Sequence, residues 1–331
     1  MPCYNVASTL DEALSSLMVQ SLTDFEVVAV DDGSTDGTLV RLQDWAKRDQ
    51  RIKVLTLPHQ GIIASLNAGL HACKADIVTR MDADDRSIPT RLSKQVEMLA
   101  DHPEIAVLGS LVKGFPEGQL GDEFRAYIDW LNTLITDEEI KSGMFIQSPM
   151  AHPGVSYRRE WVYRAGGYQD HGWAEDYDLW LKLYLAGAKF GKVPDILLEW
   201  RDHPSRLTHT DDRYSLESNT RLKAHYLLLG PLSRCNEVII LGSGDIAMRL
   251  GKQLLHLGCA SVTNEGATPG NNGQPSHWMS NLASENFRKR VHLDQHPAII
   301  VAESDPERRA CFSRYLASLQ LLEMVDWWTV Q

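Results

Sequence analysis

The sequence has 331 residues, of which 43% are hydrophobic and 23% charged, and its 33 Lys+Arg against 44 Asp+Glu give a net charge of −11. A chain of this length holds about two domains of ordinary size. The composition excludes a disordered, collagen-like or coiled-coil protein. It also argues against nucleic acid as a partner, because an acidic protein repels a polyanion unless basic residues gather on one face.

The five cysteines are scattered along the chain without a CxxC pair. This pattern predicts reduced thiols in a cytoplasmic protein rather than a disulfide framework or a zinc site. The sequence contains no run of about 18 apolar residues, and its first residues, MPCYN, do not form a signal peptide. We therefore expect any membrane association to be peripheral, at the inner face of the membrane.

Short apolar runs alternate with amphipathic segments over the first 110 residues. The strand-like runs are Phe25–Asp31, Ile52–Leu57, Asp76–Asp82 and Ile105–Ser110. Between them, Thr35–Arg48 and Ile62–Cys73 carry apolar residues at helical spacing. This alternation predicts βαβ units and a parallel sheet, so the expected fold class is α/β.

The remainder of the chain divides into two parts. Phe115–Ser148 is mostly helical in pattern, and Glu175–Ala186 predicts one amphipathic helix. The composition shifts after Gly230, where the strand-like Val238–Leu241 opens a separate unit. We therefore predict a first domain over residues 1–230 and a second over residues 235–331.

Three aspartates follow the predicted strand that ends at Asp82, in the segment Asp82-Ala83-Asp84-Asp85. Ligands of open α/β sheets collect at the carboxyl ends of strands. In an extended chain residues i and i+2 face the same way, so Asp82 and Asp84 can address one Mg²⁺ or Mn²⁺ ion that bridges phosphates. The alternative is an acidic turn that caps the helix after Pro89.

A second polar loop, DDGSTDGT over residues 31–38, ends another predicted strand and leads into a helix. Its carboxylates should therefore lie at the same sheet edge as Asp82. A carboxylate at this place can bind ribose hydroxyls or a base N–H group. The alternative is that Asp32 and Ser34 form only the turn and the helix N-cap.

The chain resembles a family 2 glycosyltransferase of the GT-A fold from Pro2 to about Thr208. The motifs that carry the resemblance occur in order: Pro2-Cys3-Tyr4-Asn5, Asp31–Thr38, Gly61 with Asn67 and Gly69, Arg80–Asp85, Pro89 with Arg91, His152-Pro153, Gly166-Gly167-Tyr168, Glu175–Trp180, and Trp200-Arg201 followed by His203. The resemblance implies an inverting transferase that moves a sugar from a nucleotide-diphosphate sugar to a hydroxyl of a saccharide or lipid-linked acceptor. It also implies a role in bacterial cell-surface polysaccharide or glycolipid synthesis.

The resemblance also implies roles for individual residues. Those expected to bind the nucleotide-sugar are Pro2, Tyr4, Asn5, Asp31, Asp32, Asn67, Arg80 and Asp82. A divalent metal, Mn²⁺ or Mg²⁺, would be held by Asp84 with Asp82 and by His203. Asp176 would be the catalytic base, with Glu175 as the alternative, although an acidic helix start also favours the helix dipole on its own. Apart from the resemblance, the position of Trp173 beside this base makes its ring a candidate apolar platform on which a sugar ring could stack.

The start of the chain departs from the family pattern. Family members place an apolar strand directly before the Pro-x-Tyr-Asn segment, between the strands that end here at Asp31 and Asp82, whereas Met1 stands where that strand would be ending. We therefore expect the first strand to be missing and Met1 to be an internal methionine or a misassigned start. The natural chain would then extend upstream by a strand of about 5–6 residues.

The C-terminal part, Val238–Gly244 and the helix after it, resembles the opening of a Rossmann-type unit. Ala247 completes a G-x-G-x-x-A pattern, and Glu265 stands where a ribose-binding acid would be. The insertion NEGATPGNNGQ interrupts the unit, so we expect a small Rossmann-like domain with a packing or docking role.

Two alternative functions follow from these departures. A missing first strand suits a catalytically inactive nucleotide-sugar-binding or scaffold protein. The glycine loop at residues 242–244 suits a nucleotide-dependent oxidoreductase.

Overall fold

The computed structural model describes residues 1–331 except 243, 266–296, 304, 320 and 325–326. The chain packs into two compact units. Unit 1 comprises residues 1–141, 148–171 and 175–210, and unit 2 comprises residues 142–147, 172–174 and 211–331. The predicted domain boundary at residues 230–235 stays a prediction. Most of the predicted NEGATPGNNGQ loop, residues 266–274, lies outside the described residues.

Unit 1 contains two sheets whose strands follow from the apolar runs in the sequence. The first sheet has the order β1-β2-β3 and is parallel, with β1 at Pro2–Cys3, β2 at Val27–Asp31 and β3 at Ile52–Thr56. The second sheet has the order β4-β7-β6-β8-β5. Its strands are β4 (Ile77–Thr79), β5 (Arg86–Ser87), β6 (Ile105–Phe115), β7 (Ser156–Arg158) and β8 (Lys189–Arg201).

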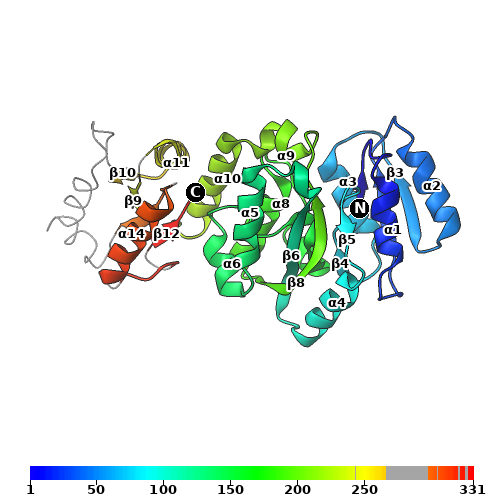
Figure 1. Cartoon of the computed structure of the whole chain (residues 1–331). Helices are drawn as coiled ribbons and strands as arrows, with labels where there is room; N and C mark the ends of the chain where they lie inside the picture. Colours follow the sequence, from blue (N-terminus) through cyan, green and yellow to red (C-terminus); the bar gives the residue numbers. More distant parts are fainter. Residues whose placement is uncertain (243, 266–296, 304, 320, 325–326) are drawn as a thin grey trace. The chain divides into compact units, whose positions relative to one another are not determined.

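Helices cover both sheets of unit 1. They are α1 (Leu10–Met18), α2 (Thr38–Arg48), α3 (Ile62–Ala72), α4 (Arg91–Asp101), α5 (Asp122–Thr133), α6 (Asp137–Gly143), α7 (Arg159–Arg164), α8 (Glu175–Leu185) and α9 (Leu207–Thr210). Figure 1 shows α1, α2 and α3 around the first sheet and α4, α5 and α8 around the second. Amphipathic spacing explains this arrangement, since α1 buries Leu10, Ala13, Leu14 and Leu17 against the first sheet.

The predicted strands and helices of the first 110 residues are confirmed with shifted ends. β4 is shorter than the predicted Asp76–Asp82, whereas β6 continues to Phe115, five residues beyond the predicted end. The extension arises because β6 pairs in parallel with β8 as far as Phe115 and Arg201. A partner strand from far along the chain therefore decides where β6 ends, and local sequence does not.

Of the first strand that the family pattern implies, which was expected to be missing, the structure contains β1 alone, a two-residue strand on the edge of β2. The amino group of Met1 donates to the carbonyl of Val28 at 2.9 Å, and Val30 N–H donates to the carbonyl of Met1 at 2.9 Å. Met1 thus continues the β1 ladder. Consequently β2 and β4 belong to different sheets.

Unit 2 holds a parallel sheet in the order β10-β9-β11-β12. Its elements are α10 (Leu216–Leu229), β9 (Glu237–Leu241), α11 (Asp245–His256), β10 (Ser261–Glu265), β11 (Ala298–Val301), α14 (Pro306–Ser318) and β12 (Trp327–Thr329). The β9-α11-β10 connection is the predicted Rossmann-like crossover. Within the described residues, no helix is long and apolar enough to cross a membrane.

Candidate active site

Three carboxylates gather directly after β4. Oxygen atoms of Asp82, Asp84 and Asp85 lie within 4.8 Å of one another. Asp85 is buried and accepts a hydrogen bond from the backbone N–H of Arg201 at 2.7 Å, while its Oδ2 has no hydrogen-bond partner. The side chain of Arg201 also holds this loop in place, because its Nε donates to the carbonyl of Asp84 at 2.6 Å.

Mutual repulsion shapes the titration of these carboxylates. Burial and the neighbouring charges of Asp84 and Asp82 raise the pKa of Asp85 well above its usual value. Burial and Asp84 likewise raise the pKa of Asp82. Burial also disfavours the charge of Asp84, but the hydrogen bond from His203 outweighs this and lowers the pKa of Asp84. The three carboxylates would therefore carry more negative charge than the neighbouring cations and hydrogen-bond donors balance.

The structure brings His203 to this cluster from 119 positions further along the chain. Its Nε2 lies 2.9 Å from Oδ2 of Asp84, and its Nδ1 lies 2.9 Å from the hydroxyl oxygen of Ser205. The second contact orients the ring so that Nε2 faces the carboxylate. The geometry thus places the predicted late ligand beside the predicted metal-binding aspartate, although its role as a ligand stays a prediction.

This donor set fits a hard divalent cation. Carboxylate oxygens are the ligands that Mg²⁺ and Mn²⁺ prefer, and an imidazole is compatible with Mn²⁺. Oδ2 of Asp85 is a buried oxygen without a partner, and a cation near it would remove the repulsion that raises the pKa values of Asp82 and Asp85. Asp82, Asp84 and His203 would be the residues that hold the ion.

The loop after β2 supplies a second buried carboxylate with a free oxygen. Asp31 is 2% exposed; its Oδ2 accepts a weak bond from Ser34 N–H at 3.3 Å, and its Oδ1 has no partner. The burial of an unpaired carboxylate oxygen is costly unless a ligand donates to it. Asp31 therefore fits the predicted role of binding a nucleoside N–H or hydroxyl group.

The carboxylate oxygens of Asp32, by contrast, have hydrogen-bond partners within the protein. Its carboxylate accepts from the backbone N–H groups of Gln60 and Gly61 at 2.9 Å each and contacts Nδ1 of His59 at 2.8 Å. These bonds hold the start of α3 next to β2. The predicted nucleoside contact of Asp32 stays a prediction, and it competes with the turn-forming alternative that the sequence also offered.

The N-terminal loop lies against the same region. Asn5 accepts from Thr35 N–H at 2.8 Å, and its own N–H donates to Ser34 Oγ at 3.0 Å. The ring of Tyr4 is 44% exposed and stacks on His59, with 4.1 Å between ring centroids. Pro2 lies in β1 beside these residues. An exposed aromatic ring at this edge can accept a nucleobase by stacking.

Asn67 also has a structural task. Its Nδ2 donates to the carbonyl of Tyr168 at 2.8 Å, and its Oδ1 accepts from Tyr168 N–H at 3.0 Å. Gly167, at φ +72°, would bring a Cβ within 2.7 Å of that Oδ1, which explains the glycine of the GGY turn. Asn67 thus positions the turn before α8, and its predicted ligand contact stays a prediction.

The charge of Arg80 acts both on Asp82, after β4, and on Asp176, at the start of α8. It is 5% exposed, pairs with the carboxylate of Asp82, and its Nε has no hydrogen-bond partner. Burial opposes its charge, but Asp82 outweighs that effect and raises the pKa of Arg80, with a smaller contribution from Glu175. The charge of Arg80 also acts on Asp176, so the end of β4 and the start of α8 lie on one side of the unit.

The first turn of α8 contains the predicted base. Burial and the neighbouring charge of Glu175 raise the pKa of Asp176 to about 7. Glu175 is 2% exposed, and its Oε1 lies 4.0 Å from Nδ1 of His152. Asp176 is the more accessible of the two acids. A carboxylate with a pKa near neutrality suits general base catalysis.

His152, from the His152-Pro153 motif, and Trp173 are both buried. Burial holds the pKa of His152 well below its usual value, so the ring is neutral, and its Nε2 lies 3.0 Å from the hydroxyl of Tyr168. Trp173 is 8% exposed and packs on His225 with 5.4 Å between centroids, both within unit 2. Trp173 therefore packs largely as a core residue, and its stacking on a sugar ring stays a prediction.

Sequence reasoning missed Arg206 and Tyr127. The charge of Arg206 acts on all three aspartates after β4, and its guanidinium lies over the rings of Phe124 and Trp200 at 4.7 and 4.9 Å. Burial raises the pKa of the Tyr127 hydroxyl group. The charge of Asp176 acts in the same direction, and that of Arg206 acts in the opposite direction. In the sequence, the signal that could have indicated Arg206 is its position three residues after His203.

Comparisons with known proteins agree with this site. The family model described as glycosyl transferase family 2 matches residues 1–166. The amylovoran biosynthesis glycosyltransferase AmsE of Erwinia amylovora is 33% identical over 193 residues, which cover 58% of this chain and 70% of AmsE. A UDP-Gal:alpha-D-GlcNAc-diphosphoundecaprenol beta-1,3-galactosyltransferase of Escherichia coli is 30% identical over 193 residues, covering 58% and 68% of the two chains.

Solved structures show the same fold. TarS of S. aureus in complex with UDP-GlcNAc has a TM-score of 0.56 at 20% identity, covering 76% of this chain and 70% of that one. The mannosyltransferase PcManGT of Pyrobaculum calidifontis, solved with GDP-Man and Mn²⁺, has a TM-score of 0.51 at 18% identity, covering 96% and 83%. This likeness confirms the predicted GT-A fold.

Proposed function

Because the chain belongs to glycosyl transferase family 2, we propose that it transfers a sugar, with inversion, from a nucleotide-diphosphate sugar to a hydroxyl group. The observation that carries the proposal is the placement of two different acidic groups on one side of unit 1, with Arg80 acting on both. One group suits a cation and a diphosphate, and the other suits a proton acceptor. A glycosyltransferase needs both.

The residues then divide the chemistry. The acceptor oxygen attacks the anomeric carbon, the bond from that carbon to the diphosphate oxygen breaks, and the hydroxyl proton passes to Asp176. Attack from the face opposite the leaving group inverts the anomeric configuration. Arg206, whose charge acts on the aspartates after β4, stabilises the negative charge that develops on the diphosphate.

A divalent cation held by Asp82, Asp84 and His203 would act as a Lewis acid toward the diphosphate. Asp31 orients the nucleoside through its free Oδ1, and Tyr4 offers its exposed ring to the base. Glu175 and His152 are buried beside each other at the start of α8, with 4.0 Å between Oε1 and Nδ1. Orientation of both substrates lowers the barrier before any proton moves.

We further propose that the product belongs to a bacterial cell-surface polysaccharide or glycolipid. Among the relatives, AmsE is named for amylovoran biosynthesis, and the name of the E. coli galactosyltransferase describes a diphosphoundecaprenol-linked acceptor. A lipid-linked acceptor would bring the enzyme to the inner face of the membrane as a peripheral protein.

The proposal is tested with the purified 331-residue protein, Mn²⁺ and a panel of nucleotide-sugars with a diphosphoundecaprenol-linked acceptor. We expect one donor to release nucleoside diphosphate in an acceptor-dependent manner and to give a product of inverted configuration. Asp176→Asn should bind this donor without transfer, and Glu160→Gln, a change on the exposed face of α7, should behave as the wild type. Retained configuration in the product would contradict the mechanism.

A further inference from the structure

Three aromatic side chains form a stripe along α5. Phe124, Tyr127 and Trp130 are spaced by three residues, so they lie on one face of the helix and follow one another at about 4.5 Å along its axis. Each is partly buried and packs against the core, and part of each side chain stays accessible to solvent. We call these three residues the aromatic stripe. Accessible rings of this kind offer a face on which a ligand can stack.

Two polar anchors hold the helix that carries the stripe. Nδ2 of Asn132 donates to the carbonyl of Val112 at 2.9 Å, and Oδ1 of Asn132 accepts from the N–H of Val112 at 3.0 Å, which ties α5 to β6. The hydroxyl of Tyr127 donates to the carbonyl of Ser148 at 2.8 Å. The rings are therefore held in place before a ligand arrives, which lowers the entropy cost of binding.

The neighbours of the stripe change along α5. The guanidinium of Arg206, whose charge acts on the aspartates after β4, lies over the ring of Phe124 at 4.7 Å. Tyr127 comes next, and the charges of both Arg206 and Asp176 act on its hydroxyl. The ring of Trp130 follows, with 6.0 Å between its centroid and that of Tyr127 and an angle of 25° between the two planes. The stripe thus runs from the side of the aspartates past the proposed base.

Inversion of configuration determines which substrate meets each part of the stripe. The acceptor oxygen attacks from the face opposite the diphosphate, so the acceptor lies on the side of the base that is remote from the leaving group. Arg206 and the aspartates mark the side of the leaving group, and Asp176 marks the attacking hydroxyl. The sugar ring that carries this hydroxyl then falls beside Tyr127 and Trp130.

The chemistry of the two rings suits a sugar. A pyranose ring has an apolar face of C–H groups, which packs on an aromatic ring while its hydroxyl groups stay at the edge. The indole N–H of Trp130 has no hydrogen-bond partner in the described part of the chain and is not among its fully buried polar groups. This N–H can therefore donate to a hydroxyl group of the stacked sugar.

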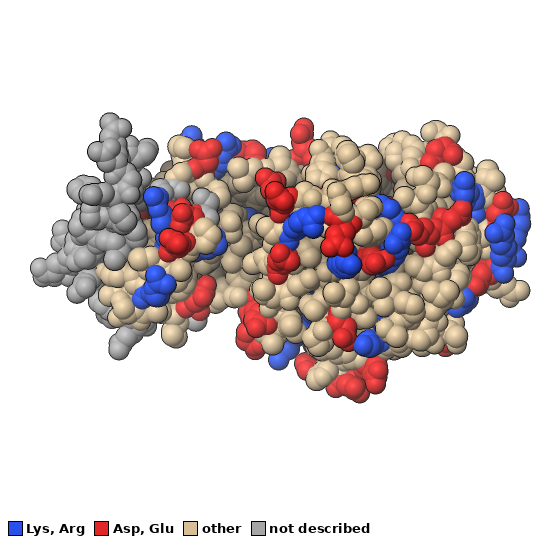
Figure 2. Space-filling view, viewed as in Figure 1, with Lys and Arg blue, Asp and Glu red and all other residues tan. Residues whose placement is uncertain are grey.

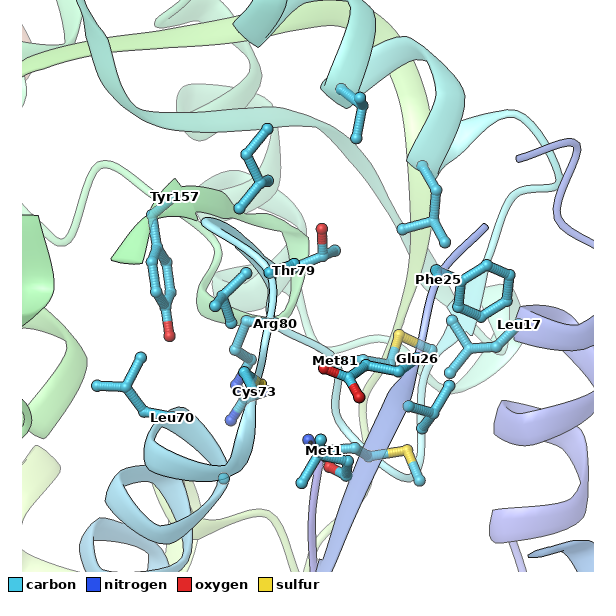
Figure 3. Close-up of a pocket in the computed structure, with 18 of the residues that line it drawn as sticks. Met1, Leu17, Phe25, Glu26, Leu70, Cys73, Thr79, Arg80, Met81 and Tyr157 are labelled. Atoms are coloured by element: carbon cyan, nitrogen blue, oxygen red, sulfur yellow. Dashed lines mark hydrogen bonds between the residues drawn. The ribbon is translucent and has the colours of Figure 1, made fainter. Parts of the chain in front are cut away.

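An apolar cavity elsewhere in unit 1 is less suited to a sugar. Its volume is about 460 Å³, and it is lined mostly by apolar residues of β2, β4, α1, α3 and α4, with Leu70, Met81 and Tyr157 among its lining residues (Figure 3). None of its lining residues belongs to α5. A sugar in this cavity would leave most of its hydroxyl groups without partners, which is costly. The partly accessible aromatic stripe avoids that cost.

We propose that Tyr127 and Trp130 form the subsite that binds the sugar ring of the acceptor, an inference that rests on the transfer reaction proposed above. The hydroxyl of Tyr127 is bound to Ser148, so Tyr127 contributes the face of its ring, whereas Trp130 contributes a ring face and a donor. The subsite selects a cyclic saccharide, because an acyclic polyol has no flat C–H face to stack.

Kinetics of the whole protein test the proposal with Trp130→Leu and Trp130→Phe. Leu keeps an apolar contact without a ring, and Phe keeps a smaller ring. With the diphosphoundecaprenol-linked acceptor, we expect Trp130→Leu to raise the acceptor KM about 10–100-fold and Trp130→Phe to raise it less, with the donor KM unchanged. The matched control is Trp161→Leu, a change at a partly buried tryptophan of α7, which should behave as the wild type. An acceptor KM that Trp130→Leu leaves unchanged would overturn the proposal.

A second measurement needs neither transfer nor a stable Leu variant. The wild-type protein is labelled with fluorotryptophan, and the fluorine resonance of Trp130 is assigned by its loss in Trp130→Phe. Methyl glycosides of glucose, galactose, mannose and N-acetylglucosamine are then added with Mn²⁺ and UDP or GDP. We expect at least one glycoside to shift the resonance of Trp130 and not that of Trp161, and ribitol to shift neither.

The two measurements separate this proposal from the proposed function. The absence of a Trp130 shift with every glycoside, or an equal shift with ribitol, overturns the saccharide subsite even if the enzyme transfers sugar. A specific glycoside shift in a protein that transfers no sugar supports the subsite and contradicts the proposed transfer alone.

Discussion

The two acidic groups of unit 1 differ in what balances their charge. Around Asp82, Asp84 and Asp85 the balance comes from fixed cations and donors, namely Arg80, His203 and backbone N–H groups. At the start of α8 a bound proton neutralises the charge, because burial and the neighbouring charge of Glu175 raise the pKa of Asp176 to about 7. In the first arrangement the contact with His203 lowers the pKa of Asp84, so this carboxylate keeps a charge that suits a cation, whereas Asp176 gains and loses a proton near neutral pH.

Surface charge alone would not reveal this difference. Figure 2 shows Lys and Arg side chains next to Asp and Glu on the visible face of the protein. Arg86, for example, pairs with both Glu12 and Glu199. Such exposed pairs contribute little to stability, and burial is what distinguishes the functional carboxylates from them.

Asp176→Asn should have the largest effect. We expect kcat to fall about 10²–10⁴-fold with donor affinity unchanged, because the carboxylate acts on the acceptor proton in the chemical step. Isothermal titration with the donor and steady-state kinetics measure the two quantities. If affinity and kcat fall together, Asp176 supports the fold and Glu175 becomes the candidate base.

Asp84→Asn should abolish the response to metal. The amide keeps the shape and the contact with His203 but removes a charged ligand, so we expect Mn²⁺-dependent transfer to fall about 10²–10³-fold while Tm changes little. Asp101→Asn, at the exposed end of α4, is the control. Near-normal transfer by the Asp84 variant in the presence of a chelator would contradict the metal role.

Substitutions of His203 test whether this residue coordinates the metal ion or only orients the carboxylate of Asp84. We expect His203→Ala to weaken the apparent Mn²⁺ affinity about 10–100-fold. His203→Gln can still donate to Asp84, so recovery of affinity in this variant would show that the histidine only orients the carboxylate. Failure of Gln to restore it supports direct coordination, and Mn²⁺ titration of transfer measures both.

The pH dependence follows from the pKa of Asp176. Because a base acts when ionised, the rate should fall about tenfold per pH unit below about pH 7. The raised pKa means that the folded state holds the proton more tightly than the unfolded state, so ionisation costs stability as pH rises from about 4 to 7. Asp176→Asn should therefore raise Tm at about pH 8 and leave it unchanged at about pH 4. A Tm difference independent of pH would refute the assignment.

The smallest effect on transfer is expected in unit 2. Gly244→Val should lower stability without changing transfer, through strain at φ +96°, since no atom lies within 4 Å of a Cβ there. The tight approach is at Gly242, where a Cβ would come within 1.9 Å of the carbonyl of Ala302. Gly242→Ala should thus lower Tm more. An NAD(P) affinity that either change destroys would instead favour the oxidoreductase alternative.

Much of this molecule could be predicted from its local sequence. Apolar runs located β2, β3 and β9, helical spacing located α2 and α3, and the aspartates after β4 were recognisable because a strand end and a DxDD segment occur together. The Rossmann-like crossover after β9 followed from the same periodicity. These features depend on residues close together in the chain, where hydrophobic spacing and turn chemistry act directly.

Only the tertiary structure decided which polar residues remain available for a ligand. Asp31 and Asp32 are adjacent in sequence, but loop 59–61 takes both oxygens of Asp32 and leaves Oδ1 of Asp31 free. The contact of His203 with Asp84 joins residues 119 positions apart. The sequence pattern contains residue types and spacings, whereas burial and long-range partners determine which oxygen is free and which carboxyl titrates near neutral pH.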